Sequence, residues 1–474
     1  MSLTASLNSA MSGLSLTSRR AEAVASNVAN ADTDGYRRRE IVQGEIPGRA
    51  VTRRVVDPAL AQLRRDASAD AARAGTAEAF HARLDAAIGD PGDPGSVQAR
   101  LAAFDAALVA AASDPTSGTL LAAVARDAGA LADRLNDVAD VVTAARQGAD
   151  AAIDATVRAL NSDLADVADL NARIMRVEAS GQDASDLRDR RGLLVDRISE
   201  AIPVRRLARD GGAVALVSAG GTILLDGRAA AIEFTPQAVV TDDMVAPGQL
   251  SELTIHGRPV ATGGAGAVGG GRLGALFDIR DRDAPAATDQ LDAFAADLID
   301  RFARVGTDPS LGPGNPGLFT DAGGALSAAP PAGLAARLRV NDVLDPTDPA
   351  TLLPLRDGFG ALVAGPAGDP AQLLRFGAAL HLRDVPVTDP ARSAGSLVDL
   401  LGTMRSEISS SRIRSEDEGA VARAHADNLT AARDGGPVDT DAEMRRLIEI
   451  ERAYAANARV IQAVDAMMDR ITEI

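Results

Sequence analysis

Both ends of the chain carry apolar and small side chains that recur at alternating intervals of three and four residues. One repeat runs from Leu3 to Ala31 and the other from Leu447 to Ile471. This heptad spacing puts a narrow apolar seam on a helix of about 30 residues, and such a seam needs a partner helix. We expect the two terminal helices to pack together, within or between subunits, through Leu3, Leu7, Leu14, Val24, Val28, Leu447, Ile450, Tyr454, Asn457, Ile461, Val464 and Met468. The plainer alternative is two independent amphipathic helices.

Between the two ends the pattern changes twice. Residues 66–200 are alanine-rich with helical spacing, and turn residues interrupt them at 89–96 and 113–118. From Pro203, the short runs VRRLA, AVALVS, TILLD and AAIEF are separated by glycine-containing turns, which predicts a β-meander. Helical spacing returns at 273–305 and 394–433, with a Gly- and Pro-rich stretch between these two regions.

This order of elements predicts an α+β protein. We expect a long helical rod or coiled coil, formed by both chain ends, that carries an inserted β-rich domain. A chain of 474 residues with 46% hydrophobic residues also exceeds one ordinary core. The predicted segments are a terminal helix at 1–35, the first part of the rod at 36–202, the β domain at 203–272, a helical return at 273–320, an irregular or β insert at 321–393, the last part of the rod at 394–436 and a terminal helix at 437–474.

Composition excludes several classes of protein. Without cysteine the chain has no disulfide framework and no thiol nucleophile. Its net charge of −17 argues against nucleic-acid binding, although residues 1–65 are basic and could form a DNA-binding arm or a surface that faces another subunit. No window is apolar enough to insert into a membrane, and the first residues lack the pattern of a cleaved signal peptide.

Two stretches resemble sites for a ligand. NADTDG at 30–35 begins like a calcium-binding EF-hand loop, but the bidentate Glu expected at position 12 is Ile41. Gly264, Gly266 and Gly269 formally match the dinucleotide fingerprint, but residues 273–305 read as one helix where a second strand should follow, so a flexible linker is the better interpretation. We therefore expect no metal, no cofactor and no enzyme, with a dinucleotide-dependent enzyme as the distant alternative.

The stretch SNVANADTDGYRRRE at 26–40 resembles the signature of bacterial flagellar rod, hook and hook-associated proteins. Asn30, Gly35 and Tyr36 stand at matching places, and Asp34 replaces the usual proline. The C-terminal run from Asp439 is similar to the partner helix of the same axial family. The interior motifs DLRDRRGLLVD and GGRLGALFDIRD resemble the hook-associated protein 1 family, which joins hook to filament.

The resemblance implies a structural role. Members of this family leave the cell unfolded through the flagellar type III system, without cleavage, and polymerise through their terminal helices. The expected partners are further copies in a ring, the hook protein, the second hook-associated junction protein and an export chaperone that binds the C-terminal helix. The expected place is the extracellular hook–filament junction, and Asn30, Gly35 and Tyr36 join the residues expected at the assembly interface. The nearer alternative is another axial protein, either the second junction protein or a rod or hook subunit.

Overall fold

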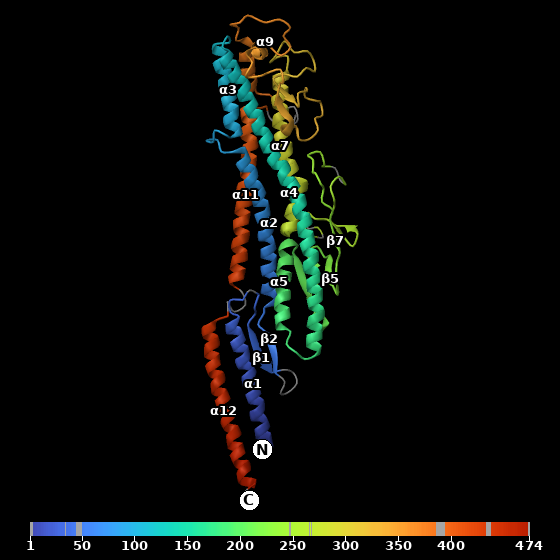
Figure 1. Ribbon diagram of the computed structural model, residues 1–474, viewed down its shortest axis with the longest axis vertical. Coiled ribbons are helices and arrows are strands. Elements are labelled where there is room, and N and C mark those ends of the chain that lie inside the picture. Colours follow the sequence, from blue (N-terminus) through green and yellow to red (C-terminus); the bar gives the residue numbers. More distant parts are fainter. Residues whose placement is uncertain are drawn as a thin grey trace.

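The computed structural model of the chain is an elongated rod of long helices, with both termini at one end (Figure 1). It describes residues 3–33, 35–43, 50–245, 248–264, 266, 268–384, 394–432 and 438–472. The expected α+β class is confirmed, because long helices stand at both ends of the chain and small sheets lie between them. The long helices are α1 (Leu3–Ala29), α2 (Pro58–Ile88), α3 (Val97–Ser113), α4 (Gly118–Ala179), α5 (Ser185–Ala201), α7 (Ala284–Ala303), α11 (Leu397–Ala431) and α12 (Thr440–Thr472).

The rod is built around α4, whose 62 residues extend about 90 Å. Its heptad positions are buried along the whole helix, as at Leu135, Val138 and Leu164. Capping side chains fix where the rod helices begin: the Asp57 carboxylate accepts from the first turn of α2, and Ser117 caps α4. Ser396 and Asp399 form a reciprocal capping box at the start of α11.

Helices from the first and the last part of the chain pack side by side along the rod. Helix α11 runs beside α2, and α1 runs beside α12 (Figure 1). At the end far from the termini, the rings of Phe104, Phe302, Phe319 and Phe376 pack together in the core. Helix α10 (Ala371–His381) packs on α3 there, near the short elements α8 (Leu334–Arg337), β10 (Phe319–Asp321), β11 (Leu338–Val340), η3 (Pro349–Leu352) and α9 (Leu353–Asp357).

The β domain projects from the side of the rod (Figure 1). Its main sheet is the expected antiparallel meander, in the order β3-β4-β5-β6. The run AAIEF does not extend this meander, because only Ile232–Glu233 form a strand there, and that strand pairs with β8 in a second sheet. The strands are β3 (Val204–Ala208), β4 (Val214–Ser218), β5 (Ile223–Asp226), β6 (Arg228–Ala229), β7 (Ile232–Glu233), β8 (Thr254–Ile255) and β9 (Arg258–Pro259), with the short helix η1 (Asp210–Gly212) between β3 and β4.

One expectation is corrected by the structure. The first part of the rod, expected to be helical, contains a β-hairpin of β1 (Arg39–Gln43) and β2 (Ala50–Arg54), with Ile41 opposite Thr52. The segment 321–393, expected to be irregular or β, contains in its described part the short helices α8, α9 and α10 and the three-residue strand β11, between stretches without regular structure. The division into seven segments stays a prediction.

The glycine stretch before α6 contains local backbone hydrogen bonds in its described part. The amides of Gly266, Val268 and Gly269 each donate to a nearby backbone carbonyl. A Cβ at Gly269 would lie 2.1 Å from the Gly264 carbonyl oxygen, which leaves no cradle for a phosphate. The chain then continues as α6 (Gly271–Asp278), a π-helical turn η2 (Ile279–Asp283) and α7, without the second strand that the dinucleotide fingerprint requires.

Candidate assembly interface

The two terminal helices form a pair at one end of the molecule. Helices α1 and α12 lie side by side (Figure 1), and Gly13 of α1 faces Asn457 of α12. A Cβ added at Gly13 would lie 2.8 Å from the Asn457 side-chain nitrogen, so the absence of a side chain there makes room for the α12 amide. On α1, Ala10, Thr17 and Val24 are buried at intervals of one heptad, and on α12 Val464 is buried. The structure therefore pairs the two helices with these positions buried, while the predicted set of interface residues stays a prediction.

The other predicted seam residues are only partly covered. Tyr454 and Met468 are 47% and 48% exposed. The side chain of Leu3 lies outside those that the structure describes. The half-buried members are Leu7, Leu14, Val28, Leu447, Ile450, Asn457 and Ile461. In the single subunit these side chains keep exposed surface, which additional helices can cover.

A buried polar cluster joins the end of α1 to the start of α12. The Glu443 side chain is 1% exposed and accepts hydrogen bonds from Asn27 Nδ2 at 3.0 Å, from Arg38 Nε at 2.7 Å and from Arg446 Nη1 at 2.7 Å. Asn27, which is fully buried, also accepts from the Tyr36 hydroxyl at 2.9 Å. A buried carboxylate is tolerated when cations and donors surround it, so this cluster fixes how the two helices meet.

Sequence reasoning did not place Asn27, Arg38 and Glu443 in the interface. One signal was available, because Glu443 stands four residues before Leu447 and so continues the three-four spacing of the seam. A charged residue at such a position is a candidate for a buried ion pair. The identity of its partners depends on the fold, since Asn27 and Glu443 are 416 residues apart.

The turn after α1 contains the three remaining predicted residues. Asn30 donates from its side chain to the Ser26 carbonyl at 2.9 Å, and the Tyr36 ring lies under the Arg39 guanidinium at 4.8 Å. Gly35 has φ +78°, and a Cβ there would lie 2.7 Å from the Leu193 side chain. Glycine is therefore favoured at this position for two reasons: the backbone has a positive φ, and a side chain would clash with Leu193 on α5. Among described residues no cluster of His, Asp or Glu could hold a metal.

Ion pairs attach the hairpin to the rod. Arg39 Nη2 lies 2.5 Å from Asp186 and 3.3 Å from Asp189, both on α5, and Arg54 also pairs with Asp189. The hairpin is held to α1 by a hydrogen bond of 3.2 Å from Arg19 to the Ala50 carbonyl. Several arginines of the basic segment 1–65, which could have been a DNA-binding arm, therefore form contacts within the subunit.

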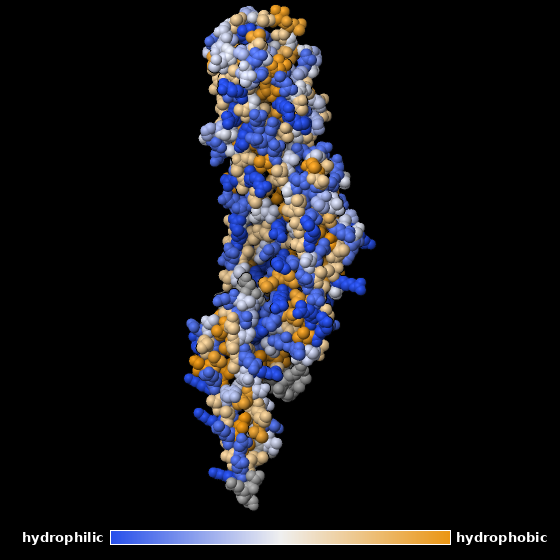
Figure 2. Space-filling view, in the orientation of Figure 1, coloured by the Kyte–Doolittle hydropathy of each residue, from blue (hydrophilic) through white to orange (hydrophobic). Residues whose placement is uncertain are grey.

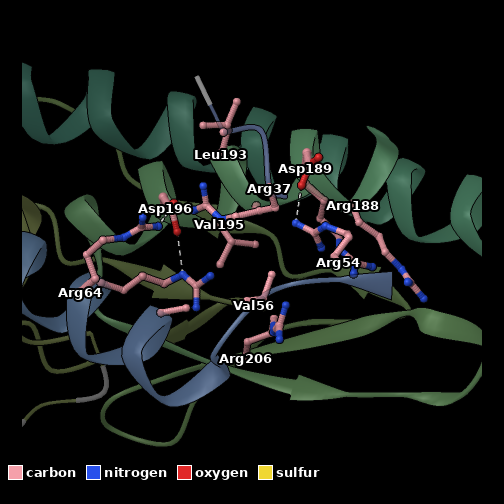
Figure 3. Close-up of a pocket in the computed structure, with 15 residues that line it drawn as sticks. Arg37, Arg54, Val56, Arg64, Arg188, Asp189, Leu193, Val195, Asp196 and Arg206 are labelled. Carbon is pink, nitrogen blue, oxygen red and sulfur yellow. Dashed lines mark hydrogen bonds and ion pairs between the residues drawn. The ribbon is translucent and has the colours of Figure 1, made fainter. Parts of the chain in front are cut away.

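Behind these ion pairs lies a small cavity of about 30 Å³, which we call the arginine pocket (Figure 3). It is enclosed by the turn after α1, by β2 and β3, and by α2 and α5. Asp189 and Asp196 are its acidic residues, and its cationic residues are Arg37, Arg54, Arg64, Arg65, Arg188, Arg191 and Arg206. Burial, followed by the nearby guanidinium groups of Arg206, Arg188 and Arg54, lowers the pKa of Arg191 to about 10.

No helix in the described part of the chain is both long and apolar enough to cross a membrane. Neither the polar cluster nor the seam contains a nucleophile beside a general base in the arrangement that acyl or phosphoryl transfer requires.

Three family models match the chain in succession. They are "Flagella basal body rod protein" at residues 7–37, "Flagellar hook-associated protein FlgK helical domain" at 81–316 and "Flagellar basal body rod FlgEFG protein C-terminal" at 437–474. The first covers α1 and its turn, the second covers most of the rod and the β domain, and the third covers α12.

A curated relative points the same way by name. Flagellar hook-associated protein 1 of Bacillus subtilis (strain 168) is 26% identical over 241 residues, which are 46% of this chain and 47% of that protein. The chain thus aligns with less than half the length of that relative. The solved structure of the flagellar hook junction protein FlgK from Burkholderia pseudomallei aligns with a TM-score of 0.44 and 21% sequence identity. The alignment covers 55% of this chain and 46% of that one, and the likeness is too low to support an argument about the fold. These matches support a FlgK-type flagellar hook-associated protein, since the interior is similar to the helical domain of FlgK and both termini are similar to flagellar rod proteins.

Proposed function

We propose that this protein is a structural subunit of the bacterial flagellum that joins the hook to the filament. Its family points to a structural, non-enzymatic role in the flagellum. The terminal matches are shared with rod proteins, whereas the interior match is to the hook-associated helical domain, and this favours the junction over the rod or hook.

The proposal rests on one observation: the apolar side chains of α12 are only partly covered in the single subunit. The large apolar side chains of this helix stay about half exposed in the single subunit, at Met444, Ile448, Tyr454, Val460, Met467 and Met468. Figure 2 shows apolar patches at the end of the molecule where α1 and α12 lie. When a helix pair leaves apolar side chains uncovered, helices of neighbouring subunits can pack on them, as in a tube of subunits.

The finer parts of the proposal follow from the family. The subunits form a homo-oligomeric ring that contacts the hook protein on one side and the second hook-associated junction protein on the other. Before assembly the chain passes unfolded through the flagellar type III export system, without a cleaved signal peptide, and a cytoplasmic chaperone binds α12. The exposed side chains of α12 give such a chaperone an apolar surface to bind.

The test separates contacts between subunits from contacts within one subunit. Val460 is 45% exposed on α12, so Val460→Asp leaves the buried positions of the α1–α12 pair in place. In the assembled tube the same carboxylate would be buried without a partner, at a cost of several kcal/mol. We expect wild-type protein to cap isolated bare hooks in electron micrographs and Val460→Asp to leave them bare.

The control is Val109→Asp, an equal change at a 67% exposed position on α3, far from the terminal helices. This variant should cap hooks like the wild type. Capping by Val460→Asp as well would contradict the role of α12. Binding of the wild type only to hooks that already carry the first junction protein would make this chain the second junction protein, and binding to neither would overturn the proposal.

A further inference from the structure

The arginine pocket holds more positive charge than its carboxylates neutralise. Asp189 is shared by Arg39 and Arg54, so one carboxylate serves two guanidinium groups. Asp196 is likewise shared, by Arg64 at 2.5 Å and Arg65 at 2.8 Å. Figure 3 shows these two acidic groups on α5, with their arginines reaching them from α2 and β2.

The remaining arginines depend on weaker partners. Arg188 pairs with Glu178 at 2.5 Å, outside the pocket lining. Arg191 is only 5% exposed, and its guanidinium donates to two neutral oxygens, Asn171 Oδ1 at 2.7 Å and the Gly212 carbonyl at 2.9 Å. Neutral acceptors satisfy the N–H groups of a guanidinium but leave its charge in place.

Two further donor groups have no acceptor in the described part of the chain. The side chain of Arg206, on β3, is exposed at the edge of the pocket and forms no hydrogen bond or ion pair with any side chain that the structure describes. The Nε atom of Arg54 is buried and has no acceptor in the same part of the chain. Desolvation, together with the charges of Arg65 and Arg54, lowers the pKa of Arg206. Such crowding of cations in a protein whose net charge is −17 is a local and costly arrangement.

An oxyanion would relieve this excess of charge. Guanidinium groups bind phosphate and carboxylate groups through paired N–H donors, and several arginines converging from different elements make a strong field for one anion. A volume of about 30 Å³ exceeds the roughly 10–15 Å³ that one water needs, so it admits a small anionic group.

We propose that the arginine pocket binds an oxyanion between the terminal unit and the rod. The anion is either a free inorganic ion such as phosphate or the carboxylate of an acidic side chain from a neighbouring subunit, and this second source rests on the proposed function. In both cases the anion contacts β2 on one side and α2, α5 and β3 on the other. Binding therefore stiffens the joint at which the paired helices meet the rod.

The test uses the full-length monomer and two probes, inorganic phosphate and succinate, against chloride at matched ionic strength. Thermal unfolding of the wild type should shift upward by roughly 2 °C or more once phosphate exceeds its Kd, and the shift should keep growing with the logarithm of the phosphate concentration. Arg206→Gln should lose most of this shift. The matched control is Arg205→Gln, because Arg205 is exposed and its side chain points to the opposite face of the same strand; it should keep the full shift.

The two probes distinguish the sources of the anion. A shift with phosphate alone, beyond that in chloride, would support a free ion, and a shift with succinate as well would support a carboxylate side chain. Equal shifts in all three proteins, or no shift of the wild type beyond that in chloride, would overturn the proposal. Since this measurement needs no hooks, its failure is distinct from a failure of hook capping.

Discussion

At the scale of single residues, Glu443 is the side chain on which the pairing of α1 and α12 depends most. It is nearly fully buried and binds Asn27 and Arg38 near the end of the other helix, as well as Arg446 on its own. Glu443→Gln keeps the shape but removes the charge, so the guanidinium groups lose their counterion. We expect the pair to be weakened by about 1–3 kcal/mol.

Trypsin can measure this loss, because α12 contains the exposed arginines Arg445, Arg452 and Arg459. Cleavage there requires α12 to open, and its rate follows the population of the open form. A weakening of about 1–3 kcal/mol should raise that rate roughly 5- to 150-fold. Glu449→Gln, an equal change at an exposed position of the same helix, should leave it unchanged. Equal rates for Glu443→Gln and wild type would show that the cluster does not hold the pair.

At the scale of elements, α1 and α12 are packed tightly where Gly13 lies opposite Asn457. Gly13→Leu raises the helix propensity of α1 by nearly 1 kcal/mol but places a branched side chain where the amide now lies. We expect the helices to move apart. The chain contains no cysteine, so spin labels at Ser9→Cys and Arg459→Cys, both exposed positions, would be its only thiol labels.

The distance between the two labels should lengthen or broaden in Gly13→Leu. The control, Gly148→Leu on α4, changes an exposed glycine whose added Cβ would meet nothing within 4 Å, and should give the wild-type distance. An unchanged distance in Gly13→Leu would mean that Asn457 simply moves aside and that the contact does not set the spacing of the helices.

The terminal helices were predictable from sequence because their signal is long and periodic. The hairpin was not, since REIVQ and AVTRR are five-residue strands rich in charge, which read as a basic arm. Helix α10 was missed for a similar reason: AQLLRFGAALH is only three turns long and includes a glycine. The polar cluster and the arginine pocket bring together residues far apart in the chain, so no local pattern could have placed their partners.

At the scale of the whole molecule, burial is distributed unevenly along the rod. Helix α4 is buried by neighbours on several sides, with Leu131, Leu135 and Val138 fully enclosed, whereas on α12 only Glu443 and Val464 are buried among the described side chains. Local opening costs least where few apolar contacts are lost. The single subunit should therefore have a stable rod and a terminal pair that opens far more readily.

Amide hydrogen exchange measures this difference directly. In the monomer we expect the amides of α12 to exchange roughly 10-fold or more faster than those of α4 around Leu135, because α12 can open without unfolding the rod. In protein bound to hooks, α12 should become protected while α4 changes little, since neighbouring helices would then cover Tyr454, Val460 and Met468. Equal protection of α4 and α12 in the monomer would mean that the pair is already complete within one subunit. The exposed apolar side chains of α12 would then need an explanation other than assembly.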